Sequence, residues 1–298
     1  MTTLEQLKVS FGVDGEKQFE YLNNKNRGGV NNSKGNTFEN FFTVYQIAIF
    51  FNTLPDWEDI LFSSQAFCFI DDLVIELNAI RDKYHFQIKD VEKLSWTDDI
   101  HAVKDDFTRQ YKIGCDQKVD SYLYLVVSRK EVYDHLVADL PNEIKGLVKV
   151  IHFETASSLN NLIRKNPLIK AELGKMCALE NPSVDKLDTL GAILLGSWDS
   201  TDKNRISLKE LLDRSRAQNP NFIRGFGTEV SKKLSEILKS IAGFCYTVES
   251  GYLNWRFNDT DDGVLKYCIG SFEYEQWEND VFNTVVITFE DLEPLLAS

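Results

Sequence analysis

The residues best suited to chemistry lie in two short apolar stretches, IDDLVIEL at 70–77 and YHFQIKD at 84–90. The first stretch carries the acidic Asp72, and the second carries Gln87 and Lys89 two positions apart. Because side chains alternate between the two faces of a strand, Gln87 and Lys89 are expected on one face. If the two stretches are paired strands, a carboxylate, an amide and an ammonium group come together there.

This combination suits the hydrolysis of a phosphodiester bond. A bound divalent cation activates a water molecule and neutralises the charge that builds on the phosphate. Mg²⁺ prefers hard oxygen ligands and keeps several waters. We therefore expect Asp72 and Gln87 as metal ligands and Lys89 beside the attacking water, with Glu39 as a further ligand or water holder. Asp71 remains an alternative to Asp72, which is favoured because apolar residues follow it directly.

Each of these residues also has a simpler interpretation. Gln87 and Lys89 suit the water-facing side of a strand, and the acidic pair suits a charged strand edge that discourages aggregation. Glu39 suits a capping box with Asn36 at the start of a helix. His85 lies on the same predicted strand face, where it would either line the site or, as we favour, be a solvated histidine. Only the order and spacing of the whole set favour a site.

The pattern of apolar residues predicts the elements that must position this set. Residues 1–35 are polar and end in a Gly- and Asn-rich stretch, which predicts a loop. Helical and alternating patterns then follow in the order helix, strand, strand, helix, strand, helix, strand, at 36–54, 66–77, 84–90, 98–113, 121–128, 130–140 and 148–153. This order predicts an α/β domain over 1–156, with a mixed sheet flanked by helices.

The pattern changes from residue 157 onward. Several helical stretches come first, and strand-like stretches follow at 245–250, 252–257, 264–272 and 283–289, with a predicted turn at Asp-Asp-Gly 261–263. This predicts a mixed α+β domain over 157–298. Because it carries no catalytic motif, we expect it to serve assembly or partner binding.

Composition limits the other possibilities. The chain has 298 residues, 43% of them hydrophobic, which is enough for a substantial core. Its net charge of -13 is unlike that of a general nucleic-acid binder, so DNA binding would need a local basic patch, a metal ion or a partner. The five cysteines show no metal-ligand or disulfide pattern. With no signal sequence and no apolar run near the ~20 residues of a membrane span, a soluble, cytoplasmic protein without membrane contact is expected.

The stretches KGNTFENFFTVYQIAIFF, DDLVIE and YHFQIKD resemble the PD-(D/E)xK nuclease superfamily, in particular its Mrr-like branch, where Gln-x-Lys replaces Glu-x-Lys. NRGG at 26–29 and the YQ pair in the predicted helix resemble the double-stranded-DNA endonuclease domains of bacterial antiphage systems, such as the CBASS-associated and Lamassu effectors. The resemblance covers roughly residues 27–155. It implies a restriction-endonuclease-like sheet, in which Asp72 and Gln87 are metal ligands, Lys89 is the catalytic lysine and Glu39 is a supporting carboxylate.

The resemblance also implies a function and partners. The activity would be Mg²⁺- or Mn²⁺-dependent cleavage of double-stranded DNA within a bacterial defence complex. The other subunits would include an SMC-like or other ATPase, or a second copy of this chain. Two alternatives remain open at this point: a nuclease-fold adaptor without activity, and an unrelated α/β module in which these residues do not meet.

Overall fold

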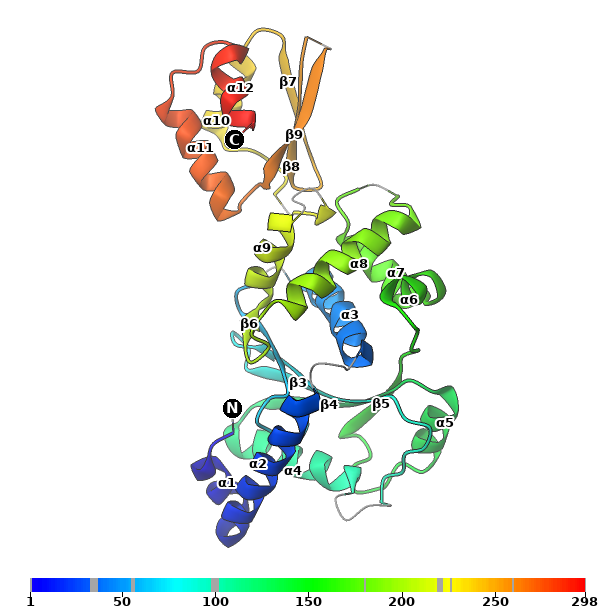
Figure 1. Ribbon diagram of the computed structural model, residues 1–298. Coiled ribbons are helices and arrows are strands. Elements are labelled where there is room, and N and C mark those ends of the chain that lie inside the picture. Colours follow the sequence, from blue (N-terminus) through cyan, green and yellow to red (C-terminus); the bar gives the residue numbers. More distant parts are fainter. Residues whose placement is uncertain are drawn as a thin grey trace. The chain divides into compact units, whose positions relative to one another are not determined.

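The computed structural model describes residues 2–32, 37–54, 57–97, 102–179, 181–218, 222–225, 227–258 and 260–297. The chain forms two compact units, each of which we describe by itself (Figure 1). The first unit comprises residues 1–173 and 194–212, and the second comprises 174–193 and 213–298. Residues 157–173 and 194–212 pack with the first unit, so the units do not divide after residue 156 as predicted.

The first unit is built on a mixed sheet of six strands in the order β5-β4-β3-β2-β1-β6 (Figure 1). The pairs β3–β4 and β4–β5 are parallel, whereas β2 is antiparallel to both β1 and β3. The strands are β1 (Ile60–Ser64), β2 (Leu73–Leu77), β3 (Asp82–Lys89), β4 (Asp120–Val127), β5 (Val148–His152) and β6 (Ile206–Ser207). The predicted mixed α/β sheet is thus confirmed. The strand predicted at 66–77 begins only at Leu73, and β1 forms where no strand was expected.

Helix α3 (Thr37–Thr53) covers one face of this sheet. Phe42 packs edge-on against Phe86 of β3, and Phe50 packs against Tyr84 of the same strand. The helix is apolar around most of its circumference, which is typical of a helix buried on every side. None of the helices in the described ranges is both long and apolar enough to cross a bilayer.

The opposite face is covered by α4 (Val103–Gln117) and α5 (Lys130–Ala138). Phe107 and Leu136 pack there against Leu123 and Leu125 of β4. The other helices that belong wholly to the first unit are α1 (Leu4–Phe11), the short 3-10 helix η1 (Gly12–Asp14), α2 (Gly15–Asn32) and α6 (Leu159–Lys165). Residues of both units occur in α7 (Pro167–Met176), α8 (Val184–Asp199) and α9 (Leu208–Gln218).

The loop prediction for residues 1–35 was wrong, because α1, η1 and α2 occupy most of this segment. Leu7 and Leu22 are fully buried in a cluster with Phe69 and Ile113. Tertiary packing of these few apolar side chains outweighs the poor helix propensity of the Asn and Gly residues in α2. This helix matters for the candidate site described below, because α2 supplies the charged side chain of Lys25.

The second unit contains a three-stranded antiparallel sheet, β7 (Phe244–Glu249), β8 (Tyr252–Phe257) and β9 (Asp261–Cys268), with helices α10 (Lys232–Ser240), α11 (Phe272–Asn283) and α12 (Phe289–Ala297) (Figure 1). The predicted helices and small sheet are confirmed. Two details were wrong. Residues 261–263 begin β9 instead of forming a turn, and 284–288 form no strand, because Val285 and Ile287 are exposed and have no neighbouring strand among the described residues.

Candidate active site

Asp72 is the centre of the candidate site. It lies one residue before β2, where its Oδ2 accepts a hydrogen bond from the Ile88 backbone N–H at 2.7 Å and another from the Gln87 amide. The Lys89 ammonium lies 3.2 Å from the same oxygen. The antiparallel register places Leu73 opposite Phe86, so the end of β3 passes directly beside Asp72. The predicted convergence of Asp72, Gln87 and Lys89 is therefore confirmed, whereas their chemical roles stay predictions.

The side chains of Gln87 and Lys89 do not form a water-facing strand surface. Gln87 is only 4% exposed, and the Lys89 side chain is about one-third exposed. Of these two side chains, only that of Lys89 reaches the surface. A buried amide beside a buried carboxylate is costly unless both are hydrogen-bonded, and here they bond to each other. The simpler interpretation as a solvated strand face is excluded for Gln87.

Glu39 approaches from the first turn of α3, on the other side of Asp72. Gln65, which the sequence did not single out, connects the two carboxylates, because its Nε2 lies 3.4 Å from Glu39 Oε2 and 3.4 Å from Asp72 Oδ1. Gln65 follows β1 directly and has a left-handed φ of 51°. The alternative role of Glu39 in a capping box involves Asn36, which lies outside the described residues.

Behind this group lies a buried ion-pair cluster. Lys25 of α2 lies 3.2 Å from Asp71 Oδ1 and 3.0 Å from Asp106 Oδ2 of α4, and it also donates to the Phe69 carbonyl. Its ammonium lies 3.4 Å from the Gln87 amide oxygen. Asp71 therefore turns toward Lys25 and Asp72 toward Lys89. This geometry separates the two neighbouring carboxylates and leaves Asp72 as the one beside the candidate lysine.

Burial and mutual repulsion set the protonation of these acids. Burial raises the pKa of Glu39 to about 8, with a further contribution from the Asp72 charge. Burial also raises the pKa of Asp71 to about 6, although Lys25 acts in the opposite direction. Partly buried carboxylates that repel one another favour the binding of a proton or another cation. Perturbed acids in one cluster are common at functional sites, but structural ion-pair networks perturb them as well.

His85 has a structural role, and the expectation of a solvated histidine was wrong. Its ring is buried, with Nδ1 3.2 Å from the Ile70 carbonyl oxygen and Nε2 3.4 Å from the Gln110 amide nitrogen. Burial lowers its pKa to about 4, so the ring is neutral at physiological pH. A neutral imidazole whose two nitrogens face protein groups is satisfied within the fold.

The donor set suits a hard divalent cation with few protein ligands. In the described part of the chain, no three His, Cys, Asp or Glu side chains lie together as a ligand group. A metal here would therefore have the carboxylates of Asp72 and Glu39 and the amide of Gln87. Mg²⁺ is bound in this way, by one or two carboxylates with waters and substrate phosphates. The residues fit such an ion in donor type, provided that Gln87 presents its amide oxygen, which now faces Lys25.

The residues that sequence reasoning missed are Lys25, Gln65 and Asp106. Lys25 lies four positions after Tyr21, whose hydroxyl donates to Asp106 at 3.0 Å, so both face the same way from α2. That helical spacing was the available signal, and the loop prediction for 1–35 concealed it. No comparable signal marks Gln65, because only the folded turn brings it between Glu39 and Asp72.

The comparisons with known proteins add no assignment: no family model, no curated protein and no solved structure matches this chain. The functional argument therefore depends on the chemistry of the residues themselves.

Proposed function

We propose that this chain is a metal-dependent DNA endonuclease subunit, located in the cytoplasm and acting within a bacterial antiphage defence complex. The observation that supports the proposal is the meeting of Asp72, Gln87 and Lys89 at the end of β3, with Glu39 nearby. Double-stranded DNA is the proposed substrate, Mg²⁺ or Mn²⁺ the proposed cofactor, and an SMC-like or other ATPase the proposed partner. The family resemblance of the motif supports these finer points.

Each residue has a role in this proposal. Asp72 and Glu39 would hold the cation, with the amide oxygen of Gln87 as the third protein ligand. The cation would supply charge neutralisation at the phosphate and an activated water. Lys89, whose side chain is about one-third exposed, would orient that water and stabilise negative charge on the phosphate. The Ile88 backbone N–H holds the Asp72 carboxylate in place.

The net charge of -13 bears on how such an enzyme would work. Repulsion between an acidic protein and the phosphate backbone lowers non-specific DNA binding. The chain would then cut only when a partner supplies DNA or drives assembly. Activity should therefore be tested on the complex that copurifies with the chain from its native operon.

The test is nicking of supercoiled plasmid by that complex in Mg²⁺, Mn²⁺ or EDTA. Lys89→Ala should reduce cleavage by ~10²–10³, the usual effect of removing one such electrostatic group. Lys83→Ala is the matched control, because Lys83 lies on the same strand, pairs with Glu76 at 3.4 Å and is similarly exposed. The control should cut like wild type. If Lys89→Ala also cuts like wild type, Lys89 is not the catalytic lysine.

A nuclease-fold adaptor without activity is the second candidate, and one observation favours it. Asp72 Oδ2 already has three donors from within the chain, from Gln87, Ile88 and Lys89, so the network is satisfied without a metal. An adaptor predicts no cleavage in any metal and a complex that survives Lys89→Ala. Titration of Mn²⁺ into the chain separates the candidates, because only the enzyme predicts binding that Asp72→Asn abolishes.

A further inference from the structure

The two edges of the sheet in the second unit differ in a way that matters for assembly. β9, at one edge, carries Asp261, Asp262 and Lys266, and charges of this kind discourage pairing with other strands. β7, at the other edge, reads FCYTVE and has Glu249 as its single charge. No strand among the described residues pairs with the outer side of β7. A sheet edge that lacks such charges is expected to pair with another strand.

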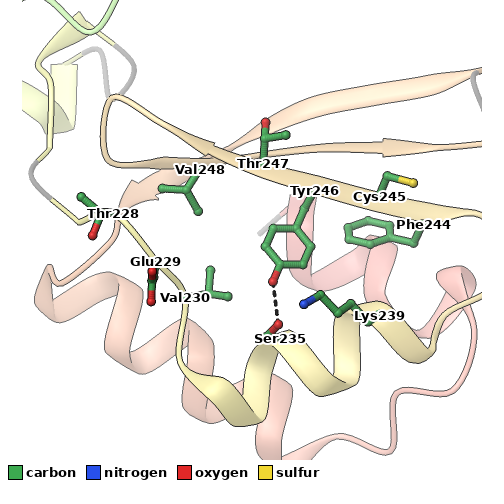
Figure 2. A pocket seen from close by; sticks show the side chains of 10 residues that line it. All are labelled: Thr228, Glu229, Val230, Ser235, Lys239, Phe244, Cys245, Tyr246, Thr247 and Val248. Carbon is green, nitrogen blue, oxygen red and sulfur yellow. Dashed lines mark hydrogen bonds between the residues drawn. The ribbon is translucent and has the colours of Figure 1, made fainter.

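A slot lies along this open edge. It has a volume of about 600 Å³ and is bounded by β7 residues 244–248, by α10 and by residues 228–230 (Figure 2). Tyr246 points from β7 toward α10, where its hydroxyl donates to Ser235 Oγ at 2.8 Å (Figure 2). Because five consecutive residues of an edge strand line the slot, an extended chain beside β7 fits its shape.

The charges at the two ends of the slot are opposite. Glu229 lies near Val248 at one end, and Lys239 lies near Phe244 at the other (Figure 2). Both are exposed, and neither has an ion-pair partner in the part of the chain that the structure describes. A segment that satisfies both must carry a positive charge at the first end and a negative charge at the second.

The geometry points to a second copy of this chain as the occupant, with the two β7 strands paired antiparallel about a two-fold axis. Such a pairing is isologous, so each copy offers the same surface. Centred on Tyr246, it uses all the β7 residues of the slot and sets Cys245 opposite Thr247 of the second copy. The antiparallel direction also brings Lys239 of each copy to the end where the other copy carries Glu229. This inference is independent of the proposed nuclease activity.

The first test is a crosslink in the full chain. Residues directly opposite in an antiparallel pair have Cα atoms about 4.5–5.5 Å apart, which suits a disulfide. Oxidation of Thr247→Cys should therefore give a covalent dimer through Cys245 of the second copy. Thr247→Cys combined with Cys245→Ser is the control and should give none. Equal crosslinking in the two variants would overturn the inference.

The second test is sedimentation of charge-reversed variants. In the Lys239→Glu variant an acid of one copy meets an acid of the other at each end of the pairing, and in the Glu229→Lys variant a base meets a base. The like charges repel, so each variant alone should dimerise roughly tenfold more weakly than wild type. An equimolar mixture of the two variants should recover the wild-type affinity as a heterodimer. A wild-type chain that stays monomeric at its highest soluble concentration, or a mixture that behaves like the single variants, would overturn the inference.

Discussion

At the scale of single residues, the candidate site depends on two adjacent acids with different partners. Asp71 faces Lys25 and Asp72 faces Lys89, although they are consecutive in the chain. Both precede β2, so their directions are set by the approach to the strand and by the cations that they meet. One carboxylate thus contributes to the support of the fold, and the other is left beside the candidate lysine.

The supporting role of Lys25 can be measured by its removal. Lys25→Met leaves Asp71 buried without its cation and leaves Asp106 with Arg109 as its remaining ion-pair partner, at 3.3 Å, so the free energy of unfolding should fall by about 3 kcal/mol. Lys17→Met is the matched control on the same helix, because Lys17 is largely exposed and pairs only with exposed Asp14. Urea unfolding should show little change for the control. Equal losses in the two variants would show that the buried cluster does not stabilise α2.

Glu39 predicts a pH dependence of stability that its replacement removes. In the unfolded chain its pKa is near 4.5, whereas in the folded chain it is about 8. Between these values the folded state holds a proton that the unfolded state has lost, so rising pH destabilises wild type. Glu39→Gln should therefore gain stability relative to wild type from pH 4.5 to 8, by up to about 1.4 kcal/mol per pH unit, and level off above.

The measurement is unfolding of both proteins in EDTA across that pH range. Glu131→Gln, at the exposed first turn of α5, is the control and should follow wild type. A constant difference between Glu39→Gln and wild type at all pH values would contradict the raised pKa.

At the scale of elements, the turn between β1 and β2 controls how the acids meet. Gln65 has a left-handed φ of 51°, an unfavourable region for a residue with a side chain. Its backbone carbonyl accepts from Asn26 of α2 at 3.0 Å, so the turn also contacts the helix that supplies Lys25. Strained residues of this kind persist where the surrounding structure holds them.

Glycine substitution separates strain from function in this turn. Gln65→Gly should raise the free energy of unfolding by about 0.5–1 kcal/mol, because relief of the left-handed strain exceeds the entropy cost of glycine. It should also weaken metal binding, since the Gln65 amide that holds the Glu39 and Asp72 carboxylates in position is lost. Arg81→Gly is the matched control, with a φ of 60° in the β2–β3 turn away from these acids. It should gain similar stability and leave Mn²⁺ binding unchanged. A loss of binding in both variants would argue against a specific role for Gln65.

At the scale of the whole molecule, the first unit is not a contiguous stretch of the chain. β6 pairs with β1 at the edge of the sheet. Trp198 Nε1 donates to Asn40 at 3.2 Å, and Asn52 of α3 donates to the Glu172 carbonyl at 2.9 Å. Residues well beyond 156 therefore cover the side of α3 that faces away from the sheet.

This arrangement predicts where the chain can be cut. A fragment of residues 1–159 should not unfold cooperatively, because it lacks β6 and also lacks Glu172 and Trp198, which form hydrogen bonds with α3. A fragment of 1–212 contains all of the first unit and should unfold cooperatively. Circular dichroism during heating distinguishes the two. Cooperative unfolding of the shorter fragment would show that residues after 159 are dispensable for the first unit.

The sequence by itself determined the order of elements from α3 to β5, apart from β1, because these segments have strong apolar periodicity and fold in chain order. It also determined the convergence of Asp72, Gln87 and Lys89, because strand alternation and one short turn bring them together. Only the tertiary structure decided that 1–35 is mostly helical, that Lys25 and Gln65 belong to the site, and that 194–212 complete the first unit. These features depend on contacts between residues far apart in the chain, which local pattern does not encode.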